Sequence, residues 1–197
     1  MYRGSNPSAL RSQHVLALAL VELIQEYAYS EITVTMLSAK AGVSRQTFYK
    51  MFDGKEDVVR YVAKVRCLDF ELQMVKRESM TLEELAECTF AFFCDNIILV
   101  RQLISNQLQH ILQEQAQRAL TDLLTCFRCN DELLLDSSNC TFIAGGLCAM
   151  LVQWAEQNDA IFPEKQAARF AKLFTVRSFT RTAPVEQASE KLLKAYS

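Results

Sequence analysis

The sequence predicts an all-α protein of two parts, and three observations support this. Only five Gly and three Pro occur among 197 residues, and the frequent Leu, Ala, Gln and Glu favour helices. Hydrophobic residues recur at helical spacing in most segments, and no run alternates for long enough to predict a strand. Three helices joined by tight turns precede one long helix, so we expect one domain over residues 1–54 and a second over residues 55–197.

The helices of the first part are expected where hydrophobic spacing and turn residues agree. The first follows Ser8 and covers residues 8–29, and two short helices follow it, each about two turns long. Asp53-Gly54 then precedes a long helix over residues 55–76. The later helices are expected over residues 81–94, 97–104, 106–129, 136–158, 163–179 and 184–196.

Charge and hydropathy narrow the class of protein. The net charge is −2 and the isoelectric point is near 5.8, which argues against a wholly basic nucleic-acid binder. The longest uncharged stretch, Ser137 to Ala155, becomes continuously apolar only at Phe142, so it is shorter than the roughly 20 residues that a membrane span needs. The N-terminus has no apolar stretch typical of a signal peptide. We therefore expect a soluble, cytoplasmic protein with no membrane partner.

Catalytic and metal-binding motifs are not found. The seven Cys do not form the even set of a disulfide framework, and Cys126-x-x-Cys129 lacks the second pair or nearby His that a zinc site needs. We expect buried or idle thiols there, with a thiol sensor as the alternative. The sequence contains no GxSxG, P-loop or GxGxxG motif. These absences predict no enzyme, no cofactor and no metal.

The segment from Thr33 to Lys55 has the pattern of a helix-turn-helix. Two short helices are joined by Ala41-Gly42-Val43-Ser44, where Gly42 can adopt the left-handed conformation that ends the first helix. The Ser44 hydroxyl can cap the second helix. The side chains expected to face inward are Leu37, Ala41, Val43, Phe48 and Phe52.

The outward side chains of the second short helix suit DNA. Arg45 and Gln46 can make bidentate contacts to guanine and adenine, and Thr47 can meet a thymine methyl or a phosphate. The residues suited to phosphate are Tyr49, Lys50 and Lys55. Residues 33–55 carry four basic groups and one acidic group, whereas residues 61–197 carry 14 basic and 17 acidic groups. Spacing and charge alone also fit an ordinary helical hairpin with a solvated face, or a helical adaptor that docks proteins.

The same segment closely resembles the N-terminal domain of the tetracycline-repressor (TetR) family of bacterial transcriptional regulators. The matching residues are Thr33-Val34, Leu37, Ala41-Gly42-Val43-Ser44, Thr47-Phe48-Tyr49, Phe52 and Lys55-Glu56. The resemblance implies DNA contacts at Thr33, Thr35, Ser44, Arg45, Gln46, Thr47, Tyr49, Lys50 and Lys55. Two positions depart from the family pattern, because Ala28 and Gln46 stand where the family usually has Gly. Gln46 adds a base-reading side chain, so the operator of relatives does not carry over.

The second part resembles the TetR regulatory domain in length and helical pattern. Phe142-Ile143-Ala144-Gly145-Gly146 and Trp154, followed by Pro163, look like the family's penultimate helix and the start of its last one. The resemblance implies a homodimer through these two helices, and its expected interface is Phe142, Gly145, Gly146, Ala149, Phe170 and Phe174. A core helix within one chain is the alternative. The helix over 55–76 is then the lever between the two parts.

A small-molecule effector is expected to bind within the second part, so the resemblance implies a repressor released from a palindromic operator. The candidate pocket residues are Phe70, Met74, Phe90, Phe93, Phe127 and Trp154, and each would otherwise be plain core. These side chains suggest an apolar or aromatic ligand. The motif Ser44 to Tyr49 together with Trp154 also resembles TetR-like activators of dihydroxyacetone use, which bind a partner protein instead.

Overall fold

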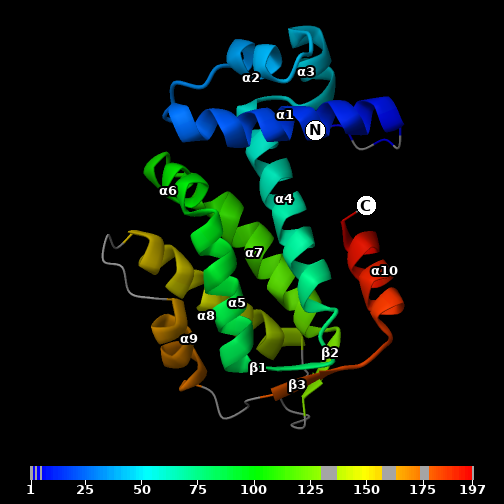
Figure 1. The fold of residues 1–197 in the computed structure, drawn as a ribbon, viewed down its shortest axis with the longest axis vertical. Helices are drawn as coiled ribbons and strands as arrows, with labels where there is room; N and C mark the ends of the chain where they lie inside the picture. Colours follow the sequence, from blue (N-terminus) through cyan, green and yellow to red (C-terminus); the bar gives the residue numbers. More distant parts are fainter. Residues whose placement is uncertain are drawn as a thin grey trace.

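The structure is a computed structural model that describes residues 2, 4, 6–129, 137–156, 163–173 and 178–196. Within these residues the chain forms ten helices and three very short strands (Figure 1). The helices are α1 (Pro7–Glu26), α2 (Val34–Lys40), α3 (Arg45–Met51), α4 (Lys55–Met74), α5 (Leu82–Asp95), α6 (Ile97–Ser105), α7 (Gln109–Leu124), α8 (Ser137–Glu156), α9 (Pro163–Ala171) and α10 (Val185–Ala195). The strands are β1 (Ser79–Thr81), β2 (Phe127–Cys129) and β3 (Ser178–Arg181).

Helices α1, α2 and α3, which we call the head, pack across one end of the molecule (Figure 1). The Asn6 side chain accepts a hydrogen bond from the Ser8 amide at the start of α1, and Pro7 occupies the first turn, where its missing N–H costs nothing. The core of the head contains Leu16, Leu20, Leu37, Phe48 and Phe52, all nearly inaccessible to solvent. The predicted all-α class and the helix-turn-helix are therefore confirmed.

Helix α4 leaves the head and runs beside α7 into the larger helical part, which we call the body (Figure 1). Its 20 residues correspond to about 30 Å at 1.5 Å per residue. Its buried side includes Val58, Val62 and Phe70. Helix α4 therefore packs both on the head, through α1, and on the body, through α7.

The sequence predicts no strands, and this prediction is wrong. Ser79–Thr81, which follows the long helix predicted over residues 55–76, forms β1 of a small antiparallel sheet of order β1-β3-β2. In this sheet Met80 pairs with Phe179 and Arg128 pairs with Thr180. These strands have only three or four residues, so no alternation of burial can be recognised in the sequence. The sheet joins the far ends of α4 and α7 to the segment before α10 (Figure 1).

Several helices end earlier than their hydrophobic pattern suggests. Helix α7 covers 109–124 rather than 106–129, because the apolar residues at 126 and 127 are buried in the turn and strand that follow it. Helix α9 begins at Pro163 as expected but is assigned only to Ala171, and β3 follows at 178. Helix α1 ends at Glu26, and the residues after it form a turn. Apolar spacing alone does not separate a helix from a short buried strand that continues it.

Among the described residues, no single helix is long and apolar enough to cross a membrane. One bent pair, Leu82–Asp95 with Ile97–Ser105, meets the criteria of length and composition across a 76° bend. Of the cysteines, Cys67, Cys126, Cys140 and Cys148 are buried, as expected, whereas Cys88 and Cys94 are half-buried. Burial raises the pKa of the Cys148 thiol to about 12, which disfavours the reactive thiolate.

Candidate nucleic-acid interface

Two side-chain caps and one glycine define the helix-turn-helix formed by α2 and α3. Gly42 has φ +67°, in the left-handed region that a residue with a Cβ adopts only with strain. Thr33 caps α2 by accepting a hydrogen bond from the Met36 amide at 3.2 Å. Ser44 caps α3 by accepting from the Thr47 amide at 3.0 Å. These contacts fix where each helix begins and therefore which residues face outward.

The exposed side of α3 presents the residues expected to read DNA. Arg45, Gln46 and Lys50 are exposed, and the Tyr49 side chain is 53% exposed although its ring contacts the buried Phe48 edge-on at 5.3 Å between centroids. Thr35 on α2 is also exposed. A row of guanidinium, amide, phenol and ammonium groups along one helix provides donors for both bases and phosphates.

The hydroxyl groups of Thr33, Ser44 and Thr47 make hydrogen bonds within the helix-turn-helix. Ser44 Oγ and Thr47 Oγ1 lie 2.9 Å apart, so these two side chains hydrogen-bond to each other besides capping the helix. The Thr33 hydroxyl is used in its own cap. Thr33 therefore fixes the start of α2, and Ser44 and Thr47 fix the start of α3 after the turn. Their predicted DNA contacts stay predictions.

Lys55 points into the protein rather than away from it. Its ammonium donates to the carbonyl oxygens of Tyr29 at 2.8 Å, Ile32 at 3.0 Å and Ser30 at 3.3 Å, and it lies 4.4 Å from the centre of the Tyr29 ring. Three contacts account for all three ammonium hydrogens. Burial lowers the pKa of Lys55. In this structure Lys55 stabilises the turn after α1. This role differs from the predicted contact with phosphate.

Sequence reasoning missed the residues that connect this turn to the body. The Tyr29 amide donates to Gln102 Oε1 on α6 at 3.1 Å, so one residue links α6 to the carbonyls that hold Lys55. A glutamine on a helix carries no distinguishing spacing, and no signal in the sequence could have identified it. Ala28, which departs from the family's usual Gly, fits the turn because its φ is not positive.

The expected effector residues do not surround one cavity. All six are buried, but Phe90 and Trp154 pack edge-on at 5.7 Å, and Phe127 lies on β2. Phe93 lines a nearly filled cleft of about 20 Å³, about the space of one water. Phe70 and Met74 border an open groove of about 830 Å³ between α4 and α5. Charged residues also line this groove: Arg66, Asp69, Lys76, Arg77 and Asp95.

The expected dimer residues divide into four groups. Phe142, 70% exposed, and Ala149 lie seven residues apart on α8, and both are accessible. A Cβ on Gly146 would lie 3.5 Å from the Phe170 ring, and one on Gly145 would lie 3.6 Å from Gln117, so both glycines adjoin the chain's own helices. Phe170 is buried within the chain, which corrects its expected place in an interface. Phe174 lies outside the described residues.

Replacing Gly42 with Ala is expected to lower the free energy of unfolding by about 1–2 kcal/mol, because φ +67° strains a residue with a Cβ. Gly54→Ala is the matched control, since Gly54 has an extended φ of −164° and open space around it. Chemical denaturation of both variants measures the difference. Equal stability of the two variants would contradict the assigned conformation of Gly42.

Comparison with known proteins agrees with the architecture. Residues 17–62 match the family model for bacterial regulatory proteins of the tetR family. A comparison with curated proteins found no significant match.

Solved structures share the fold over most of the chain. The TetR family repressor AlkX from Dietzia sp. strain DQ12-45-1b is 18% identical, with 81% of this chain and 93% of that chain covered and a TM-score of 0.59. The fatty acid degradation regulator FadR from Bacillus halodurans is 18% identical, with coverage of 87% and 96% and a TM-score of 0.58. For the dihydroxyacetone kinase operon activator DhaS the identity is 18%, the coverage 82% and 93%, and the TM-score 0.57. Residues 17–62 therefore match the N-terminal domain of bacterial tetR-family regulatory proteins, and the chain as a whole shares the all-α fold of these solved structures.

Proposed function

We propose that the chain is a non-enzymatic, homodimeric repressor that leaves a palindromic DNA operator when a small-molecule effector binds. The observation that carries this proposal is the exposed row Arg45, Gln46, Tyr49 and Lys50 on a short helix fixed by caps at its start. Bidentate donors near the start of a recognition helix are suited to the major groove. One two-turn helix reads few bases, so a twofold pair of heads is needed for a specific site.

The surface of α8 and the end of α9 support pairing of two copies. Phe142 on α8 and Leu173 after α9 are 70% and 73% exposed. Large apolar side chains exposed to this degree are typical of an interaction surface. Pairing of two bodies through this surface would place two heads at a fixed distance, and tilting α4 would change that distance.

The groove between α4 and α5 is the proposed effector site. It borders α4 directly, and the Phe70 and Phe92 rings, 5.2 Å apart, form its aromatic part. Arg66, Lys76 and Arg77 provide three cationic groups along it, against the two carboxylates of Asp69 and Asp95. An effector with an apolar body and an anionic end fits this lining, and its binding against α4 would act on the lever itself.

Selection from a randomised duplex library tests the proposal. The full chain is expected to enrich a palindrome whose half-sites lie about one helical turn, or a multiple of it, apart. Two chains should bind each duplex, as measured by mass photometry. Enrichment of no common sequence would contradict the assignment of α3 as a recognition helix, and one chain per duplex would contradict the dimer.

A further inference from the structure

The C-terminal segment folds back over the body. Helix α10 buries one face, formed by Ala188, Leu192 and Tyr196 at intervals of four residues, with exposed fractions of 3%, 1% and 7%. This face packs beside α4, the lever helix (Figure 1). The Tyr196 ring therefore closes the end of α10 against the body rather than extending into solvent.

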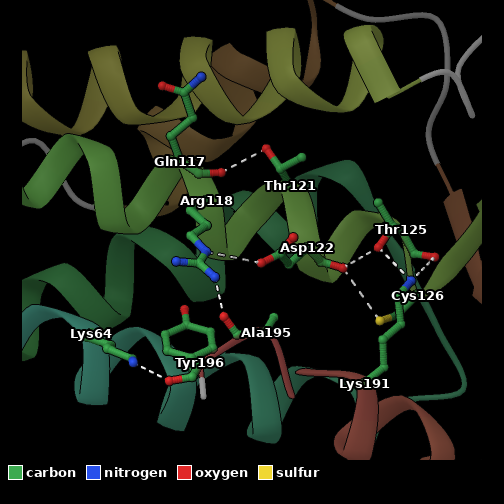
Figure 2. Close-up of polar contacts among 10 residues, drawn as sticks. All are labelled: Lys64, Gln117, Arg118, Thr121, Asp122, Thr125, Cys126, Lys191, Ala195 and Tyr196. Atoms are coloured by element: carbon green, nitrogen blue, oxygen red, sulfur yellow. Dashed lines mark hydrogen bonds and ion pairs between the residues drawn. The ribbon is translucent and has the colours of Figure 1, made fainter. Parts of the chain in front are cut away.

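Two cations from different helices hold the end of α10 (Figure 2). The Lys64 ammonium on α4 donates to the Tyr196 carbonyl, and the Arg118 guanidinium on α7 donates to the Ala195 carbonyl. Both cations also face the Tyr196 ring, at 5.6 Å for Lys64 and 5.4 Å for Arg118. The last carbonyls of a helix lack partners within it and carry partial negative charge, so these cations stabilise docking.

A second set of contacts joins the C-terminal segment to the residues that follow α4 and α7. The Lys191 ammonium donates to Thr125 Oγ1 at 2.9 Å, as Figure 2 shows. The amide of Thr182 donates to the Cys126 carbonyl at 2.9 Å. Strand β3 pairs with β1 after α4 and with β2 after α7. We call residues 178–196 the strap, because they join α4 to α7 both at their ends and along their length.

A fully buried carboxyl lies beneath the strap. Glu71 on α4 has 0% exposure, and neither of its carboxyl oxygens nor the Tyr196 hydroxyl has a hydrogen bond of standard geometry within the described residues. Burial raises the pKa of Glu71 to about 8, and Asp122 on α7 adds to this. Arg118 and the Tyr196 hydroxyl oppose part of the shift. Other titratable groups near Glu71 are Cys67 on α4 and Cys126 after α7, while Lys64 on α4 contacts the Tyr196 carbonyl.

We propose that the strap is a latch on the lever helix, held by Tyr196 and released when the Glu71 carboxyl loses its proton. An ionised carboxylate is strongly disfavoured in this buried position, whereas undocking of α10 exposes it to water. Docking of the strap holds α4 against α7, so release changes the freedom of α4 to tilt. This regulation rests on the proposed function, because it acts through the position of the two heads.

The sign of the pH dependence follows from linkage. The pKa of Glu71 is about 8 when docked and near 4.5 in water, so the docked state binds the proton more tightly. Docking is strongest below pH 4.5 and weakens as the pH rises toward 8. With these two values, the equilibrium constant for undocking is expected to increase roughly 20-fold between about pH 6.5 and 8.5.

Hydrogen exchange of the full chain tests the release directly. After correction for intrinsic exchange, protection of the amides in α10 is expected to fall roughly 20-fold between about pH 6.5 and 8.5 in the natural chain. It should change less than about twofold in Glu71→Gln. Glu190→Gln, a carboxyl change on the exposed side of α10, is the matched control and should behave as the natural chain. Equal pH dependence in the natural chain and Glu71→Gln would overturn the proposal.

Affinity for the selected duplex over the same pH range tests the effect on the heads. The ratio of affinities at the two pH values should differ between the natural chain and Glu71→Gln, by up to about the 20-fold change in the undocking constant. Equal ratios, with release seen by exchange, would overturn the latch as a regulator. If the natural chain selects no duplex at all, the proposed function is wrong, and so is the proposed effect of the strap on DNA binding. Hydrogen exchange still tests separately whether Glu71 controls docking of the strap.

Discussion

The double substitution Arg45→Ala and Gln46→Ala is expected to lower affinity for the selected duplex by about 100-fold. Each bidentate contact to a base contributes about 1–3 kcal/mol of discrimination, and tenfold in affinity corresponds to about 1.4 kcal/mol. Both side chains are exposed on α3, so their removal should change the free energy of unfolding by less than about 0.5 kcal/mol. Fluorescence anisotropy with the selected and a scrambled duplex measures the loss.

The pattern of loss is as informative as its size. Affinity for scrambled DNA should fall much less than affinity for the selected duplex, because Gln46 carries no charge and Arg45 supplies one cation among several. Arg169→Ala is the control, since Arg169 is an exposed arginine on α9, away from the head. Undiminished selectivity in the double variant would show that other residues read the bases.

Lys55→Met is expected to lower the free energy of unfolding by about 2 kcal/mol. The substitution removes a charged group that donates to three carbonyl oxygens and faces the Tyr29 ring at 4.4 Å. Hydrogen bonds to charged groups contribute about 1.5–3 kcal/mol, and the methionine leaves the Tyr29 and Ile32 carbonyls without this donor. Thermal and urea denaturation of the full chain measure the loss.

Lys50→Met makes the same chemical change at an exposed position of α3 and should leave stability within about 0.5 kcal/mol. It should instead weaken binding to selected and scrambled duplexes alike, with the salt slope reduced by about one. The opposite pattern for Lys55→Met, full stability with a reduced salt slope, would support the phosphate contact that the sequence predicted and contradict the structural role of Lys55.

The head could be predicted from the sequence because its signals are local. A glycine in the left-handed conformation, a serine cap and apolar residues at helical spacing all act within a few residues of one another. The exposed face of α3 follows once the buried Phe48 and Phe52 fix its rotation. Spacing and charge alone also fitted a solvated hairpin or a protein-docking adaptor, and the resemblance is what favoured a DNA-binding regulator.

The contacts that join distant segments could not be predicted. The strands depend on pairing between residues about 50 to 100 positions apart, and each strand is too short to show a pattern. The direction of the Lys55 side chain depends on the carbonyls of a turn more than 20 residues earlier. Buried aromatic residues were recognised as buried, but their sequence does not say whether neighbouring rings leave a cavity or fill it.

Whether α3 reads DNA sequence is decided by a salt series of DNA binding. Binding of the full chain to the selected duplex and to a scrambled one is measured between about 50 and 200 mM salt. If α3 reads the bases, binding should be saturable, at least about 1,000-fold tighter for the selected duplex, and should weaken steeply with salt. Weak binding of equal strength to both duplexes at every salt concentration would contradict sequence reading by α3.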